Sequence, residues 1–166
     1  IIRRLSGIYL PFWTFDANIH AHWRAEVGYK KTYRHYNASS KSWETRTKIV
    51  WRWEDGDVNL TVDDLMVEGS AENHISYRIL RQIYPYDLTD LVRYEPEYLA
   101  GWQAQAYETT LTDAWDEAKR SIREQAKKAC RADIPSSHVR NFSMTADFAD
   151  ETWRYILLPV YLAAYH

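Results

Sequence analysis

Two histidines separated by one residue, His20 and His22, have the types and spacing that can bind a metal ion. Alternate side chains of a β-strand point to the same face, so both imidazoles would project to one side. Asp16 has the same parity, and a third nitrogen would have to come from His35 or His74, which are distant in sequence. Alternating polar residues on a strand are ordinarily solvent-facing. We therefore predict no metal site and no cofactor.

Carboxylates and the single cysteine offer little for catalysis. Adjacent acids on a strand, such as Asp63 and Asp64, point to opposite faces and do not form an acid–base pair. Asp55 and Asp57 are expected in a turn. Cys130 lies among bases near the end of a predicted helix, where the helix dipole opposes a thiolate.

Sequence signatures of catalysis are missing as well. The chain contains no GxxxxGK[ST], GxGxxG or GxSxG motif, and its five glycines make a phosphate-binding loop difficult to build. We predict that the chain is not an enzyme, that it has no catalytic residues and that it takes no small-molecule substrate.

Aromatic residues dominate the composition, with eight Trp and 13 Tyr against four Phe. Trp and Tyr have a large apolar body and a polar tip, which suits half-buried sheet faces and interfaces. Our leading hypothesis is a non-enzymatic adaptor or assembly subunit that docks a protein partner through an aromatic sheet surface. The rings assigned to that surface are Trp13, Trp23, Tyr33, Trp43, Trp51 and Trp53.

Basic residues suggest nucleic-acid binding as the alternative function. One predicted helix carries Lys119, Arg120, Arg123, Lys127, Lys128 and Arg131 against a single acid in the same stretch, Glu124. Further bases on the predicted strands alternate with aromatic residues, a pattern that binds single strands by charge and stacking: Lys30, Lys31, Arg34, Lys48 and Arg52. The net charge of the whole chain is only -2, so any attraction to nucleic acid would be local.

The elements that would position these residues follow from hydrophobic periodicity. Alternation predicts strands through the first half, with a turn or bulge at Gly28 and turns at residues 37–41 and at the Asp-Gly hairpin of residues 54–57. Two more strands are expected over 137–147 and 153–165. Helical spacing predicts a long helix at about 110–132 and a shorter one at about 72–83. The expected fold is α+β, a twisted antiparallel sheet, or two sheets, covered by these two helices.

Length and composition restrict the class of protein further. A chain of 166 residues fits a single domain spanning 1–166, and one cysteine excludes both disulfides and multi-cysteine zinc sites within it. The longest apolar run, residues 155–165, contains Pro159 and is too short to span a bilayer. With no transmembrane segment and no secretory signal, a cytoplasmic location is expected.

Four segments together resemble a bacterial family of zinc-ribbon proteins: 7–17 (GIYLPFWTFDA), 84–88 (YPYDL), 91–102 (LVRYEPEYLAGW) and 157–161 (LLPVY). Members often carry a label likening them to the primosomal replication factor or a superfamily II helicase. The resemblance implies that this domain lies downstream of a zinc ribbon and that a C-terminal hairpin follows it, so the chain is expected to be a fragment.

The ribbon cysteines are absent from this sequence, and so is the ATP-binding loop that a helicase requires. Some relatives are encoded beside flotillin-like membrane scaffolds. By association, the resemblance implies peripheral assembly in a complex at a membrane surface.

Overall fold

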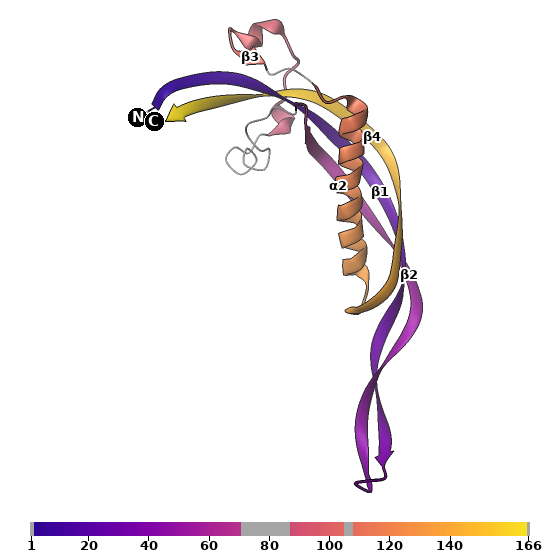
Figure 1. Ribbon diagram of the computed structural model, residues 1–166. Coiled ribbons are helices and arrows are strands. Elements are labelled where there is room, and N and C mark those ends of the chain that lie inside the picture. The colour runs from indigo at the N-terminus through magenta and orange to yellow at the C-terminus, as the bar shows by residue number, and fades with distance from the viewer. Residues whose placement is uncertain (1, 71–86, 105–107, 166) are drawn as a thin grey trace. The chain divides into compact units, whose positions relative to one another are not determined.

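The computed structural model describes residues 2–70, 87–104 and 108–165 (Figure 1). These ranges contain β1 (Ile2–Asn37), β2 (Ser42–Glu68), β3 (Gln103–Ala104), α2 (Leu111–Asp133), β4 (His138–Tyr165) and two short 3-10 helices, Leu88–Asp90 and Pro96–Leu99. The described part is mostly sheet with one α-helix, so the α+β class is confirmed at that level. The helix expected at 72–83 falls outside the described residues.

The four strands form one mixed sheet. Its order is β2-β1-β3, and β4 also pairs with β1. The short β3 runs parallel to β1, with Ile8 opposite Gln103 and Tyr9 opposite Ala104. The expectation of a purely antiparallel sheet is therefore wrong at this pairing.

Gly28, expected in a turn or bulge, and Gly56, expected in a hairpin turn, both lie inside long strands. β1 continues through Gly28 to the turn at residues 38–41, and β2 continues through Gly56. A Cβ on Gly28 would lie 2.7 Å from Ile49 Cγ2, and one on Gly56 would lie 2.7 Å from Trp23 Nε1. At both positions the absence of a side chain makes room for a closely packed neighbour. In the sequence, such a glycine looks the same as one that permits a turn.

The C-terminal strand is also continuous where two strands were expected. Within β4, Asn141 and Asp150 adopt φ angles of 52° and 54°, and Asp64 in β2 adopts 53°. Asn and Asp tolerate this left-handed conformation better than most residues, and it is typical of β-bulges. The apparent break in periodicity therefore marks bulges and not the end of a strand.

Helix α2 confirms the helix expected at about 110–132. Thr110 caps its N-terminus, because the Asp113 backbone N–H donates to Thr110 Oγ1 at 3.1 Å and Thr110 Oγ1 donates to the Asp113 carboxylate at 2.8 Å. Its buried stripe consists of mainly small residues with no exposed area: Ala114, Ala118, Ile122, Ala126 and Cys130. Small side chains let a helix approach a sheet closely. In the described residues, no helix is long and apolar enough to cross a membrane.

The chain divides into two compact units that share the long elements. The first unit comprises residues 1–17, 61–122 and 150–166, and the second comprises residues 18–60 and 123–149.

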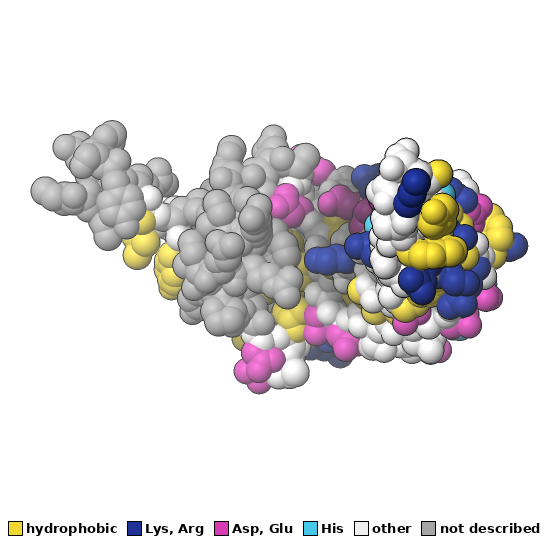
Figure 2. Space-filling view, turned by 90° about the horizontal axis from the view of Figure 1, so that it is seen from below, with side chains coloured by type: hydrophobic (Ala, Val, Ile, Leu, Met, Phe, Trp, Pro, Cys, Tyr) yellow, Lys and Arg dark blue, Asp and Glu magenta, His cyan; other side chains and the backbone are white. Residues whose placement is uncertain are grey.

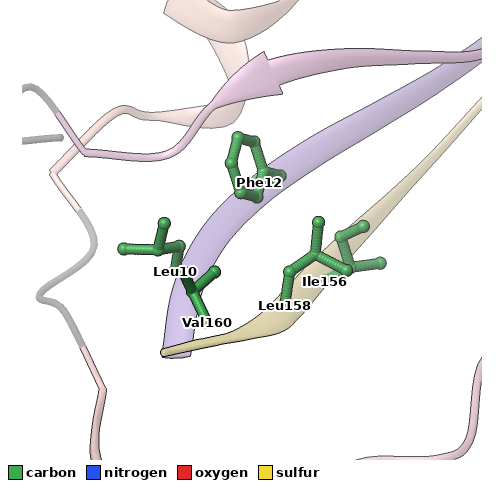
Figure 3. Packing of buried hydrophobic residues seen from close by; sticks show 5 residues of the cluster. All are labelled: Leu10, Phe12, Ile156, Leu158 and Val160. Atoms are coloured by element: carbon green, nitrogen blue, oxygen red, sulfur yellow. The ribbon is translucent and has the colours of Figure 1, made fainter. Parts of the chain in front are cut away.

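The first unit has a cluster on each face of its sheet. In one cluster Leu10 and Phe12 of β1 pack against Ile156, Leu158 and Val160 of β4 (Figure 3). In the other, side chains of the sheet pack against the N-terminal half of α2: Trp13, Phe15, Val67, Ala114 and Ala118.

The second unit buries one face of β1 beside the C-terminal half of α2. Ile19, Ala21, Trp23, Ala25 and Val27 are all buried, and the intervening residues face outward or are half-buried. The Trp23 indole N–H donates to the Asp133 carboxylate at the end of α2 at 2.8 Å. On the opposite face, β1 carries His20, His22, Arg24 and Glu26.

Candidate interaction surface

The most exposed part of the second unit is a two-stranded ribbon, residues 29–53, here called the arm. It consists of the end of β1, the turn at 38–41 and the start of β2. β4 begins at His138 beside Gly28, where the Ser136 hydroxyl donates to the Gly28 carbonyl oxygen, and α2 ends at Asp133. Beyond this point, no other strand or helix of the second unit accompanies the ribbon (Figure 1). Two paired strands without a further layer are only marginally stable in water, so side-chain contacts along the arm matter.

Aromatic rings lie at the surface of the arm. The exposed fractions are 61% for Trp43, 51% for Trp53, 48% for Tyr36 and 37% for Tyr33, and Trp51 is half-buried. Tyr36 and Trp43 meet near the turn with ring centroids 5.4 Å apart. Exposed rings gathered on one element are typical of a binding surface rather than a folding core.

Each of these rings except Tyr36 is paired with a cation. Within the arm, Arg34 lies 5.4 Å from the centroid of Trp43, Lys48 lies 5.2 Å from Tyr33 and Arg52 lies 4.3 Å from Tyr29. At its base, Arg24 lies 4.7 Å from Trp53, and Arg140 of β4 lies 4.1 Å from Trp51. Such cation–π contacts stabilise exposed sites by about 0.5–1 kcal/mol each, so they hold the ribbon together while leaving its charge accessible.

The arm is strongly basic. It contains seven Lys and Arg residues and one acid, Glu44, a net charge of +6, whereas the whole chain carries -2. Arg46 pairs with Glu44 and Arg52 pairs with Glu54. The other five cations have no carboxylate of the described residues within 4.0 Å: Lys30, Lys31, Arg34, Lys41 and Lys48. Figure 2 views the molecule from below. In the part of the surface nearest the viewer, Lys and Arg side chains (dark blue) lie among hydrophobic side chains (yellow).

Two of the rings expected at an interaction surface are core residues. Trp13 and Trp23 are exposed by only 6% and 3%, and their indole N–H groups donate to the Thr109 carbonyl oxygen and to Asp133. They belong to the face of β1 that α2 covers. The remaining four rings of the expected set, Tyr33, Trp43, Trp51 and Trp53, all lie in the arm.

The basic residues expected on the helix do not form one common patch of contacts with exposed rings. In the first unit, Lys119 pairs with Asp116 at 2.9 Å, and Arg120 is exposed. In the second unit, two arginines lie over rings of β4, Arg123 over Phe148 and Arg131 over Phe142.

Lys127 and Lys128 are exposed on the same helix. The bases that accompany the exposed rings are those of the arm, together with Arg24 and Arg140. A charge count over residues 29–53 would have found this concentration in the sequence.

His20 and His22 lie on the exposed face of the second unit, as their parity predicts. His20 Nδ1 is 2.9 Å from Asn59 Oδ1, and the Oδ1 atom of Asp57 is 3.1 Å from His20 Nε2 and 2.9 Å from His22 Nδ1. Asp55 Oδ2 lies 3.4 Å from His22 Nε2. These side chains bind one another across β1 and β2.

The contacts shift two pKa values in this cluster. The hydrogen bond with Asn59, assisted by the charge of Asp57, raises the pKa of His20 above its usual value. The hydrogen bond from His22 lowers the pKa of Asp57. Among the described residues, no group of three or more His, Cys, Asp or Glu side chains is arranged to hold a metal ion.

The other expected ligands and nucleophile lie elsewhere. Asp16 accepts hydrogen bonds in the first unit from the Asp64 backbone N–H and the Thr152 hydroxyl. His35 lies in the arm near Glu44, and His74 is outside the described residues. Cys130 is buried, and burial, with Asp133 adding to it, raises the pKa of its thiol.

Comparison with known proteins gives one informative match. The chain is 25% identical to the uncharacterized protein YdjG of Bacillus subtilis (strain 168) over 167 residues, which cover 99% of this chain and 46% of that protein. The chain thus spans about half the length of this relative. No family model matches the sequence, and no solved structure matches it significantly. The match does not establish a family, and the resemblance to zinc-ribbon proteins stays a prediction.

Proposed function

We propose that this chain is a non-enzymatic interaction module and that the arm docks a negatively charged macromolecule. The observation that carries this proposal is the combination, on one ribbon, of exposed rings with five cations that have no carboxylate partner among the described residues. Covering those cations would remove their water, which is unfavourable unless the partner supplies negative groups. The partner is therefore anionic where it contacts the arm.

The charge also limits how the arm can associate with itself. The free edges of a two-stranded ribbon are templates for pairing with another strand, and lysines on an edge discourage it. Two arms that each carry a net charge of +6 would repel one another. This favours a different molecule over a second copy as the partner.

An adaptor or assembly subunit, the role first expected from the ring-rich sequence, would use the arm to hold an acidic protein surface. A nucleic acid satisfies the same requirement for negative charge. The arm serves either role, and the surface of α2 is the competing basic site.

Retention of the purified chain on immobilised heparin tests whether the arm binds polyanions. The arm variant Lys30→Gln, Lys31→Gln, Lys41→Gln removes three exposed cations that have no carboxylate partner in the described structure. The helix variant Arg120→Gln, Lys127→Gln, Lys128→Gln removes the same charge from α2 and serves as the matched control.

We expect the arm variant to elute at markedly lower salt than the helix variant, because counterion release scales with the number of cations that contact the polyanion. Equal elution of the two variants would show that only net charge matters and would contradict the proposal. Earlier elution of the helix variant would assign the binding surface to α2 instead.

A further inference from the structure

The three tryptophans of the arm lie on one face of β2. Trp43, Trp51 and Trp53 all occupy odd positions, and alternate residues of a strand share a face. Their cation partners confirm the face in the second unit: Arg24 and Arg34, both at even positions of β1, lie over Trp53 and Trp43. Tyr29 and Tyr33 lie on the other face, where Arg52 and Lys48 contact them. The indoles thus form a row in which a guanidinium group lies over each ring.

Building on the proposed docking role of the arm, we infer that its partner is single-stranded nucleic acid, with bases stacked on Trp43, Trp51 and Trp53 and phosphates bound by the neighbouring cations. Base stacking on aromatic side chains tolerates any sequence, since every base has a π-face. Arginine guanidinium groups match the geometry of phosphate oxygens. Arg24 and Arg34 have no carboxylate within 4.0 Å among the described residues, so both are available for this contact.

The spacing of the row also suits bases. Residues two apart on a strand are separated by about 6.8 Å, which is the rise that separates Trp51 from Trp53. Stacked bases are separated by about 3.4 Å, so one base inserted between two rings needs about twice that distance. The backbone positions of Trp51 and Trp53 are therefore about as far apart as two rings that hold one base between them.

Other anionic partners fit the arm less well. A lipid surface requires one apolar face and one polar face, whereas the arm carries rings and cations on both faces and ends in the turn at 38–41. Duplex DNA exposes base edges in its grooves and hides the base faces that exposed indoles would stack on. An acidic protein supplies charge but does not require the tryptophan row.

Fluorescence anisotropy with a labelled 20-nucleotide oligothymidylate tests the inference on the whole chain. The variant Trp43→Ala, Trp53→Ala removes two exposed indoles, and Trp153→Ala is the matched control, an indole that is 55% exposed in the first unit. Loss of a stacking partner typically weakens binding about tenfold or more for each base. We expect the double variant to bind oligothymidylate at least about 100-fold more weakly, with unchanged heparin retention, and the Trp153 variant to bind normally.

A conservative variant separates stacking from damage to the fold. Trp43→Phe, Trp53→Phe keeps two π-faces in the arm, so we expect it to recover most of the lost affinity. Circular dichroism of each variant at the assay temperature verifies that the ribbon remains folded. Equal affinity of the alanine double variant and the parent chain would overturn the inference.

Three competitors decide the class of partner. Duplex DNA, polyglutamate and vesicles of phosphatidylglycerol should each displace the oligonucleotide less effectively than unlabelled oligothymidylate does. Stronger competition by any one of them would assign the arm to that class and refute the single-strand inference. Normal heparin retention without oligonucleotide binding would leave the docking role standing, whereas loss of both would remove it as well.

Discussion

Gly56→Ala is the most direct test of how closely β2 approaches the end of α2. The added Cβ would lie 2.7 Å from Trp23 Nε1 and 2.9 Å from Asp133 Oδ2, which are themselves joined by a hydrogen bond of 2.8 Å. To relieve the contact, the indole and the carboxylate must move apart or the strand must shift. Overpacking of this kind costs about 1–3 kcal/mol, and a hydrogen bond to a charged group contributes about 1.5–3 kcal/mol.

Because the Asp133 carboxylate is partly in water, we expect the combined loss to be about 2 kcal/mol. For a chain of this size that corresponds to a decrease in melting temperature of about 4–8 °C. Guanidinium denaturation followed by tryptophan fluorescence, together with a thermal melt, measures both quantities.

The experiment is decisive because an unhindered position and a closely packed one predict opposite changes in stability for Gly56→Ala. Alanine at an unhindered strand position stabilises a protein by about 0.5–1 kcal/mol relative to glycine, because it restricts the unfolded chain. A Gly56→Ala variant that is neutral or more stable would refute the close approach. Asp133→Asn provides the second side of a double-mutant cycle, and we expect less than additive losses when the two changes are combined, since both disturb the same bond.

Other predictions concern the cap, the helix stripe and the histidine pair. Thr110→Ala removes the N-cap of α2 and should lower the free energy of unfolding by about 1 kcal/mol in a denaturant titration. Ala126→Leu should overpack the helix–sheet contact by about 1–3 kcal/mol and lower the melting temperature, whereas a neutral result would show that the stripe is loosely packed. An NMR titration should give His20 a pKa above 6.5 that falls in Asn59→Ala; stability from His20 is complete below pH 6.5 and is lost as pH rises through its higher folded pKa. A His20 midpoint at or below 6.5 would contradict the observed contacts with Asn59 and Asp57.

Sequence patterns correctly predicted the elements that depend mainly on residues close together in the chain. The helix over 111–133 follows from an apolar stripe with Thr110 before it, and the turn at 38–41 follows from its polar residues. The sequence predicted a turn or bulge at Gly28 and a hairpin turn at Gly56, because a glycine that makes room for a packed neighbour looks the same in a sequence as one that permits a turn. Whether such a neighbour exists depends on residues distant in the chain.

The burial of individual rings was beyond sequence reasoning for a related reason. Trp23 and Trp53 both have odd numbers, yet odd positions of β1 face α2 whereas odd positions of β2 in the second unit face solvent. The turn at 38–41 sets a register in which even residues of β1 lie beside odd residues of β2, as Arg34 and Trp43 do. Alternation reveals that each strand has two faces, but the register decides which face the helix covers.

Cys130 gives the protein an internal reporter of local opening. It is the only cysteine in the sequence and is fully buried, as part of the stripe by which α2 packs on the sheet. A thiol-specific reagent can modify it only when the C-terminal half of the helix lifts from its sheet, so at low reagent concentration the labelling rate measures the equilibrium for that excursion. Kinetics of thiol labelling thus measure the integrity of the second unit without any engineered probe.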